Sequence, residues 1–207
     1  MNPLAETKIA IARSVMDEYI SKLPVEIQGA LKDRSLKIVD SVIYDQKYLA
    51  NDTTKELMEA SDTTKELMEA SDTTQAGITN INNRKLEPLN YMVVTGIRLL
   101  SKTISPASAG NPTDAEIAAA ALDTAAVGIL NGELDILVAG KTALPRTSCR
   151  IFGNTDSHEG KGYYQLESPF VIAPQAEIVP TLRVNAAVSS GNEVVRIELI
   201  GARIINA

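Results

Sequence analysis

The strongest pattern in the sequence is an alternation of apolar and polar residues in its C-terminal part. Between residues 164 and 188 the apolar side chains fall mainly at even positions, with glutamine, glutamate and arginine side chains between them. A period of two over such a length indicates strands with one buried and one solvated face. Because Pro169, Pro174 and Pro180 cannot donate a ladder hydrogen bond, we expect two or more shorter strands, with the prolines at edges, bulges or corners.

Similar patterns predict further strands along the C-terminal half. Residues 89–104 are apolar at both odd and even positions, which favours a strand that is covered on both faces. Thr113-Asp114-Ala115-Glu116 has the form of a capping box and is expected to open an Ala-rich helix that Gly128 ends. Other strands are expected over 130–138, 144–152 and 195–199, with turns or loops at 105–112, 139–140, 153–162 and 189–192. Roughly six to eight short strands with one inserted helix fit an antiparallel β-sandwich of jelly-roll type.

The N-terminal part has helical periodicity. Apolar residues at spacings of three and four predict an amphipathic helix over residues 4–23, between Pro3 and Pro24. Residues 25–34 are compatible with a further short helical turn. Residues 36–49 show no clean period, and their density of valine and isoleucine favours a strand. The expected fold class is therefore mainly β with an α-helical N-terminal part.

A tandem repeat follows this N-terminal part. DTTKELMEA stands at residues 52–60 and again at 62–70, and a third start, SDTT, stands at 71–74. Threonine or aspartate can cap a short helix over KELMEA. In one long helix, a ten-residue period would place the apolar residues of successive copies on different faces, so they would not form one stripe. We therefore expect short helices separated by Asp-Thr-Thr turns. The segment is either a spacer that contacts neighbours or a duplication in a tolerant surface segment, and the second interpretation is favoured.

A polar, turn-rich stretch at residues 75–83 suggests a domain boundary. The expected division is an N-terminal helical arm at 1–50, an acidic ten-residue repeat with a linker at 51–85, and a jelly-roll β-sandwich domain at 86–207.

Composition narrows the possible functions. The net charge of −6 argues against nonspecific binding of nucleic acid, and most of it lies in the two repeat copies. The chain contains no tryptophan and few aromatic residues, so aliphatic side chains must fill the core. No apolar run is long enough to predict a membrane span, and the N-terminus lacks the layout of a signal peptide. We expect no membrane span and synthesis in a cytoplasm.

Candidate chemistry is sparse. The single cysteine, Cys149, excludes an intramolecular disulfide and is interpreted as a buried structural thiol. The single histidine, His158, stands beside Asp156 and Glu159, which could form a metal site, but a polar loop tip is the favoured interpretation. No phosphate-binding glycine motif and no cluster of metal ligands is present. The sequence therefore predicts no catalytic, cofactor-binding or metal residues, no cofactor and no enzyme.

The arginines of the C-terminal half are scattered over predicted strands. We interpret them as partners in cross-strand or intersubunit ion pairs, in preference to an anion site. They are Arg98, Arg146, Arg150, Arg183, Arg196 and Arg203.

Three segments carry a resemblance to a known class of proteins. They are YMVVTGIRLLSKT at 91–103, ESPFVIAPQAEIVPTLRVNAAV at 167–188 and NEVVRIELIGARIIN at 192–206. The pattern resembles single jelly-roll virion proteins of bacteriophages. Such proteins often pair an early strand bearing Gly-Ile-Arg with Pro-bounded strands and a final strand with a Gly-x-Arg-Ile-like sequence. The resemblance covers residues 86–207 and leaves the N-terminal helix and the repeat without a counterpart.

This resemblance implies a structural protein of a phage virion, located in the virion and made in the host cytoplasm. Such a capsid or capsid-associated building block would pack against copies of itself and other virion shell proteins. No small-molecule substrate and no direct nucleic-acid binding is expected. The alternative is a ligand-binding or adhesive, carbohydrate-binding β-sandwich module, although the shortage of aromatics argues against sugar stacking.

Overall fold

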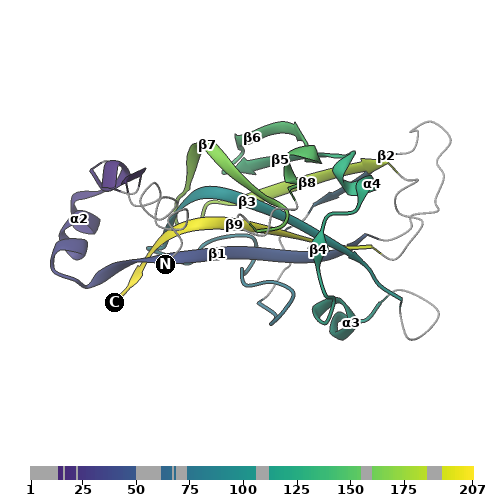
Figure 1. The fold of residues 1–207 in the computed structure, drawn as a ribbon. Helices are drawn as coiled ribbons and strands as arrows, with labels where there is room; N and C mark the ends of the chain where they lie inside the picture. Colours follow the sequence, from purple (N-terminus) through teal and green to yellow (C-terminus); the bar gives the residue numbers. More distant parts are fainter. Residues whose placement is uncertain are drawn as a thin grey trace.

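The computed structural model describes residues 14–15, 17–21, 23–49, 62–66, 68, 74–105, 112–154, 160–185 and 193–207. Two antiparallel sheets dominate this part of the chain (Figure 1). The first sheet has the strand order β1-β9-β3-β4, and β7 also pairs with β3. The second sheet has the order β2-β8-β5-β6. The strands are β1 (Leu36–Leu49), β2 (Asp62–Glu66), β3 (Tyr91–Thr103), β4 (Asp123–Thr124), β5 (Glu133–Val138), β6 (Lys141–Ser148), β7 (Tyr163–Ile172), β8 (Ile178–Asn185) and β9 (Glu193–Asn206).

The long-range strand pairs are nested along the chain. β1 pairs with β9, β2 with β8, β3 with β7, and β5 with β6, all antiparallel. The innermost pair, β5 and β6, is joined by a tight hairpin whose two turn residues, Ala139 and Gly140, both have positive φ. Two positive φ angles are the requirement of a type I′ turn, which matches the twist of the flanking strands. The strands thus form one long hairpin that is folded over into two sheets.

The main core lies between the two sheets. Its fully buried members come from both of them, including Ile97 and Leu199 of the first sheet and Leu134 and Leu182 of the second. Aliphatic side chains fill most of this core, as the shortage of aromatic residues requires. Contributions from both sheets to one core are what a β-sandwich needs to bury its two inner faces.

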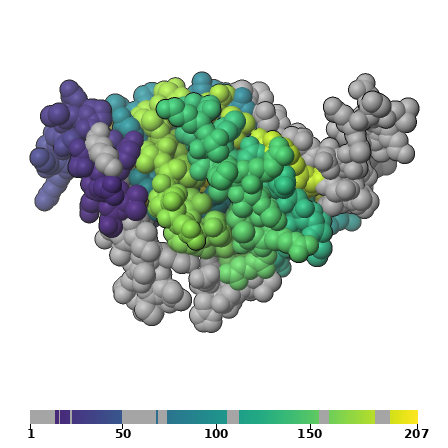
Figure 2. Space-filling view, turned by 90° about the horizontal axis from the view of Figure 1, so that it is seen from above, coloured from purple at the N-terminus to yellow at the C-terminus, as the bar shows by residue number. Residues whose placement is uncertain are grey.

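A second, smaller core lies on the outer face of the first sheet. Helix α2 (Val25–Lys32) buries Ile27 there, together with Leu23, against Val93 and Ile204. Residues 14–15 and 17–20 are also helical, whereas residues 4–13 of the helix expected over 4–23 lie outside the described residues. Figure 2 shows the described N-terminal helical residues at one end of the molecule. The short helical turn with which residues 25–34 are compatible is present as α2.

The strand predictions hold for much of the chain. Residues 36–49 form β1, and β3 is buried on both faces as expected for 89–104. The alternating stretch forms two strands, β7 and β8. Pro169 falls where the β3–β7 register shifts, Pro174 lies between the two strands, and Pro180 lies just outside the pairing of β8 with β2. Each proline thus lies where a missing N–H is tolerated.

Two predictions about the middle of the chain are wrong. The capping box at Thr113 and Glu116 is present, but the helix it opens, α3 (Asp114–Ala118), ends early. The chain then pairs as β4 with β3, and Gly128 lies inside the short helix α4 (Val127–Leu130) instead of ending a long one. Pairing with β3 outweighs alanine's helix propensity here. The strand expected over 144–152 is β6, which ends at Ser148, and a 3₁₀ turn η1 (Cys149–Phe152) follows.

The repeat differs most from expectation. Residues 62–66 of the second copy form strand β2 where a turn and the start of a helix were expected, and Met68 is fully buried in the main core. The first copy, residues 51–60, lies outside the described residues. Because β1 and β2 both pair with C-terminal strands, the sandwich extends to residues before 86. Strands β1 and β2 are therefore part of the sandwich, although the sequence placed them in an N-terminal arm and in a repeat with a linker.

Candidate assembly surface

The residues considered for a metal site are not placed by the structure. Asp156, His158 and Glu159 lie outside the described residues. Across the described ranges, no group of three or more histidine, cysteine, aspartate or glutamate side chains could hold a metal ion.

Cys149 is a buried thiol, as predicted, although it begins η1 where a strand was expected. Burial, and secondarily the negative charge of Glu133, raises the pKa of Cys149 from 9.0 to about 12. Because the thiolate is the reactive form, this side chain is protonated and unreactive at neutral pH. Its part is to fill the core.

A hollow of about 510 Å³ lies where the ends of β3 and β9 meet the segment around β4. Glu193, a buried residue of the lining, accepts hydrogen bonds from the hydroxyls of Ser101 and Thr103, the latter at 2.7 Å. Ser101 Oγ in turn accepts the Ala126 N–H at 2.9 Å. The carboxylate and both hydroxyls are thus used in bonds that tie β3, β9 and the start of α4 together.

The rim of this hollow is an ion pair. Lys161 Nζ lies 2.6 Å from Asp123 Oδ1. The hydrogen bond from Lys161, with a second from the Thr124 N–H, holds the pKa of Asp123 below its usual value. The described lining contains no aromatic side chain, so it offers no stacking surface for a sugar. The lining residues are Ser101, Lys102, Thr103, Asp123, Thr124, Ala126, Lys161 and Glu193.

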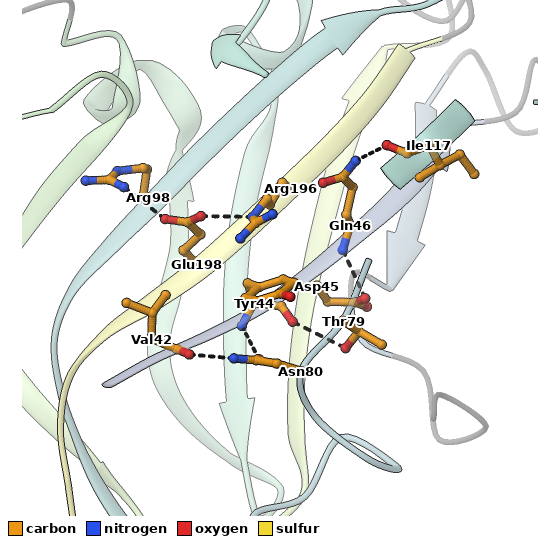
Figure 3. Close-up of polar contacts among 10 residues, drawn as sticks. All are labelled: Val42, Tyr44, Asp45, Gln46, Thr79, Asn80, Arg98, Ile117, Arg196 and Glu198. Atoms are coloured by element: carbon orange, nitrogen blue, oxygen red, sulfur yellow. Dashed lines mark hydrogen bonds and ion pairs between the residues drawn. The ribbon is translucent and has the colours of Figure 1, made fainter. Parts of the chain in front are cut away.

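The outer face of the first sheet carries a row of charged side chains (Figure 3). Glu198 on β9 accepts a hydrogen bond from Arg98 on β3 at 3.0 Å, and Arg196 Nε lies 2.8 Å from its other oxygen. The Arg196 guanidinium lies over the Tyr44 ring of β1, 3.8 Å from the ring centroid. Glu198 is only 8% exposed, so these charges are largely shielded from solvent. The row links three adjacent strands across the sheet.

Arg150 hydrogen-bonds to Asn131, and Arg196 pairs with Glu198 of its own strand. The Arg98–Glu198 contact is a cross-strand ion pair, as predicted for the strand arginines. Arg183 of β8 pairs with Asp135 of β5 on the second sheet in the same way. Arg146 of β6 pairs with Glu133 of β5, although that pair is exposed on both sides and contributes little.

The outer edge of β1 is covered over part of its length (Figure 3). The Asn80 side chain accepts the Tyr44 N–H at 2.8 Å and donates to the Val42 carbonyl at 2.7 Å. The Thr79 hydroxyl donates to the Tyr44 carbonyl at 3.2 Å, and Thr79 forms a β-bridge with Asp45. The segment around residues 75–83, which the sequence suggested as a boundary, thus seals this half of the edge.

The other half of that edge, residues 36–41, has no strand beside it within the described residues. Backbone groups of an antiparallel edge strand point alternately toward the neighbouring strand and away from it. The bonds of Asn80 show that even-numbered residues point away, so Ile38 and Asp40 direct their N–H and C=O groups outward. Ile38 and Val42 beside them are 38% and 39% exposed. We define residues 36–41 as the open edge of β1.

An open edge presents free donors and acceptors to another strand. This surface is not evident from the sequence, because residues 36–49 have no clean period. The available signal was Ile38-Val39-Asp40-Ser41-Val42, where apolar residues occur on both faces of a strand.

No helix in the described ranges is long and apolar enough to cross a membrane. Comparison of the sequence with protein-family models finds no match, and comparison with curated proteins likewise finds none.

Proposed function

We propose that this chain is a jelly-roll structural protein of a phage virion, a capsid or capsid-associated building block. It acts by packing against copies of itself and other virion shell proteins. It is made in the host cytoplasm and resides in the virion, and it is not an enzyme.

The nested strand pairing is the observation that carries the proposal. A jelly roll is a long antiparallel hairpin wrapped into two four-stranded sheets, a fold used by viral capsid proteins, lectins and cupins. The pairs β1·β9, β2·β8, β3·β7 and β5·β6 are nested as such a wrapped hairpin requires, which supports a jelly roll, and β4 is a short addition. The resemblance to phage virion proteins favours a capsid role over a lectin or cupin role. It is carried by residues 91–103, 167–188 and 192–206.

The distribution of polar groups also supports a structural role. The buried polar side chains considered above, Ser101, Glu193 and Glu198, bond to other parts of the protein and tie strands together. The open edge of β1 supplies a surface through which sheets of neighbouring copies can join, because unpaired strand edges accept additional strands. The negative net charge supports contacts with proteins in preference to nucleic acid.

The test is the location of the chain. Virus particles purified from the source that encodes it should contain the protein at a fixed stoichiometry, measured by quantitative mass spectrometry. Antibodies against the folded sandwich should label these particles in electron micrographs. Absence from purified particles while the chain is abundant in the producing cells would contradict the proposal.

A further inference from the structure

The open edge of β1 is bounded at one end by a side chain of the protein itself. β1 is the end strand of the first sheet (Figure 1). Among the residues that the structure describes, none bonds to the outward N–H and C=O groups of Ile38 and Asp40. The next outward carbonyl, that of Val42, already accepts a hydrogen bond from Asn80. An added strand can therefore pair along the edge only as far as Val42.

The other end of the open edge is set by the start of the strand. Arg34 has a φ of 66°, a left-handed conformation that turns the chain out of the strand direction just before Leu36. Helix α2, which precedes this turn, packs against Val93 of β3 and Ile204 of β9. The helix thus lies over the outer face of the sheet, so α2 does not occupy the plane beside β1.

Leu36 and Val42, the two limits of the edge, lie equally far from Val39 along the strand. We propose that the open edge binds the same edge of a second copy of the chain, antiparallel about a two-fold axis through Val39. This axis brings the start of the strand in each copy to the point where Asn80 seals the other copy. Such a contact is self-complementary, because the same residues meet in both directions. The pairing rests on the proposed packing of copies against one another, and it specifies which residues meet.

Backbone hydrogen bonding limits the choice of axis. Even-numbered residues of the open edge direct their N–H and C=O groups outward, so they must face even-numbered residues of the second copy. An axis through Asp40 would place the two Asp40 carboxylates directly opposite each other, which is destabilising. It would also bring Leu36 to Tyr44, whose N–H is already bonded to Asn80. Axes through Ile38 and Val39 remain.

The side chains decide between these two axes. An axis through Ile38 would place the Asp40 carboxylate opposite Leu36, a buried member of the smaller core. An axis through Val39 places Leu36 opposite Val42 and Val39 opposite itself. Asp40 then faces the partly exposed Ile38, and Ile38 lies diagonally across from Val42 of the second copy. The exposed large apolar side chains of β1 therefore cover one another.

This pairing would join the first sheets of two copies into one continuous sheet. A two-fold contact closes on itself, because each copy uses its open edge once. The product is a dimer, and any further growth of an assembly needs other surfaces. We therefore expect the building block of the proposed assembly to contain two copies of the chain.

Disulfide trapping tests the position of the axis. Facing residues that share no ladder bond have Cα atoms about 4.5 Å apart, within the range that a disulfide spans, about 4.4 to 6.8 Å. Val39→Cys should therefore form a covalent dimer in oxidised glutathione. The matched control is Lys37→Cys, on the same face of β1, because the two Lys37 residues would lie about 13 Å apart along the strands. The natural chain is a second control, since its Cys149 is buried.

We expect Val39→Cys to give at least about tenfold more covalent dimer than Lys37→Cys, because only the first pair lies within disulfide range. A higher yield from Ile38→Cys than from Val39→Cys would overturn the proposal, since it places the axis through Ile38. Absence of a covalent dimer from Val39→Cys, with an unchanged circular dichroism spectrum, would overturn it as well. The proposed virion role fails separately, because it is judged by the presence of the chain in purified particles.

Discussion

At the scale of single residues, two positions show how tightly the sandwich is packed. Cys149 has no exposed surface, and Gly201 of β9 faces the backbone of β3 so closely that a Cβ there would overlap the Val93 carbonyl oxygen. The core therefore has little room for a larger side chain at Cys149, and the β3–β9 pair has none for a Cβ at Gly201.

The Cys149 thiol should make stability fall in alkali. Its folded pKa is raised from 9.0 to about 12, so between these values the unfolded thiol ionises while the folded thiol keeps its proton. The unfolded state is then favoured as the pH rises, by about 1.4 kcal/mol per pH unit from this group. Cys149→Ala lacks this dependence. Urea unfolding from pH 8 to 11 should show that the free energy of unfolding falls more steeply with pH for the natural chain than for Cys149→Ala. Equal slopes would be inconsistent with a buried thiol.

Glycine substitutions should separate a packed site from an open one. Gly201→Ala forces the β3 and β9 backbones apart and should destabilise the protein by about 2 kcal/mol or more. Gly29 lies in α2 with nothing within 4 Å of an added Cβ, so Gly29→Ala should stabilise by up to about 1 kcal/mol. Thermal unfolding measures both. A Gly201→Ala protein as stable as the natural one would refute the close approach.

At the scale of elements, β1 is an edge strand with a sealed half and an open half. Asn80 and Thr79 satisfy the outward groups of Val42 and Tyr44, and the groups of Ile38 and Asp40 point outward without a described partner strand. Within the open half, successive residues direct their N–H groups alternately toward β9 and outward.

Proline substitution should therefore act differently at adjacent residues. Val39 directs its N–H toward β9, so Val39→Pro removes a ladder bond and should cost at least about 2 kcal/mol. Asp40 directs its N–H outward, and Asp40→Pro should cost less than about 1 kcal/mol. Chemical denaturation of the two variants gives the comparison. Equal losses would show that the alternation inferred from Asn80 is wrong.

The local pattern of apolar and polar residues predicted some strands correctly and missed others, for physical reasons. The strands around residues 91–103 and 163–185 follow from apolar alternation and from proline positions, which are local properties. The repeat was expected to form short helices because KELMEA favours a helix by itself. Its second copy instead contributes to a strand because the β8 edge and a core position for Met68 are available, and these exist only in the folded protein. The open edge of β1 depends on strand order, which periodicity does not encode.

At the scale of the whole molecule, the nested pairing joins segments far apart in the sequence into one sandwich. β1 and β9 form the longest pair, from Leu36 with Asn206 to Leu49 with Glu193. The open edge therefore lies on a strand held along its full length by the C-terminal strand. A sheet that presents such an edge is suited to repeated contacts between copies.

Sedimentation velocity across a range of protein concentrations tests whether copies of the chain associate through the open edge of β1. We expect the natural chain to form species larger than the monomer as concentration rises, and Asp40→Pro to weaken this association while the fold is retained. A natural chain that remains a single monomeric species at every concentration, indistinguishable from Asp40→Pro, would contradict self-packing through the open edge of β1.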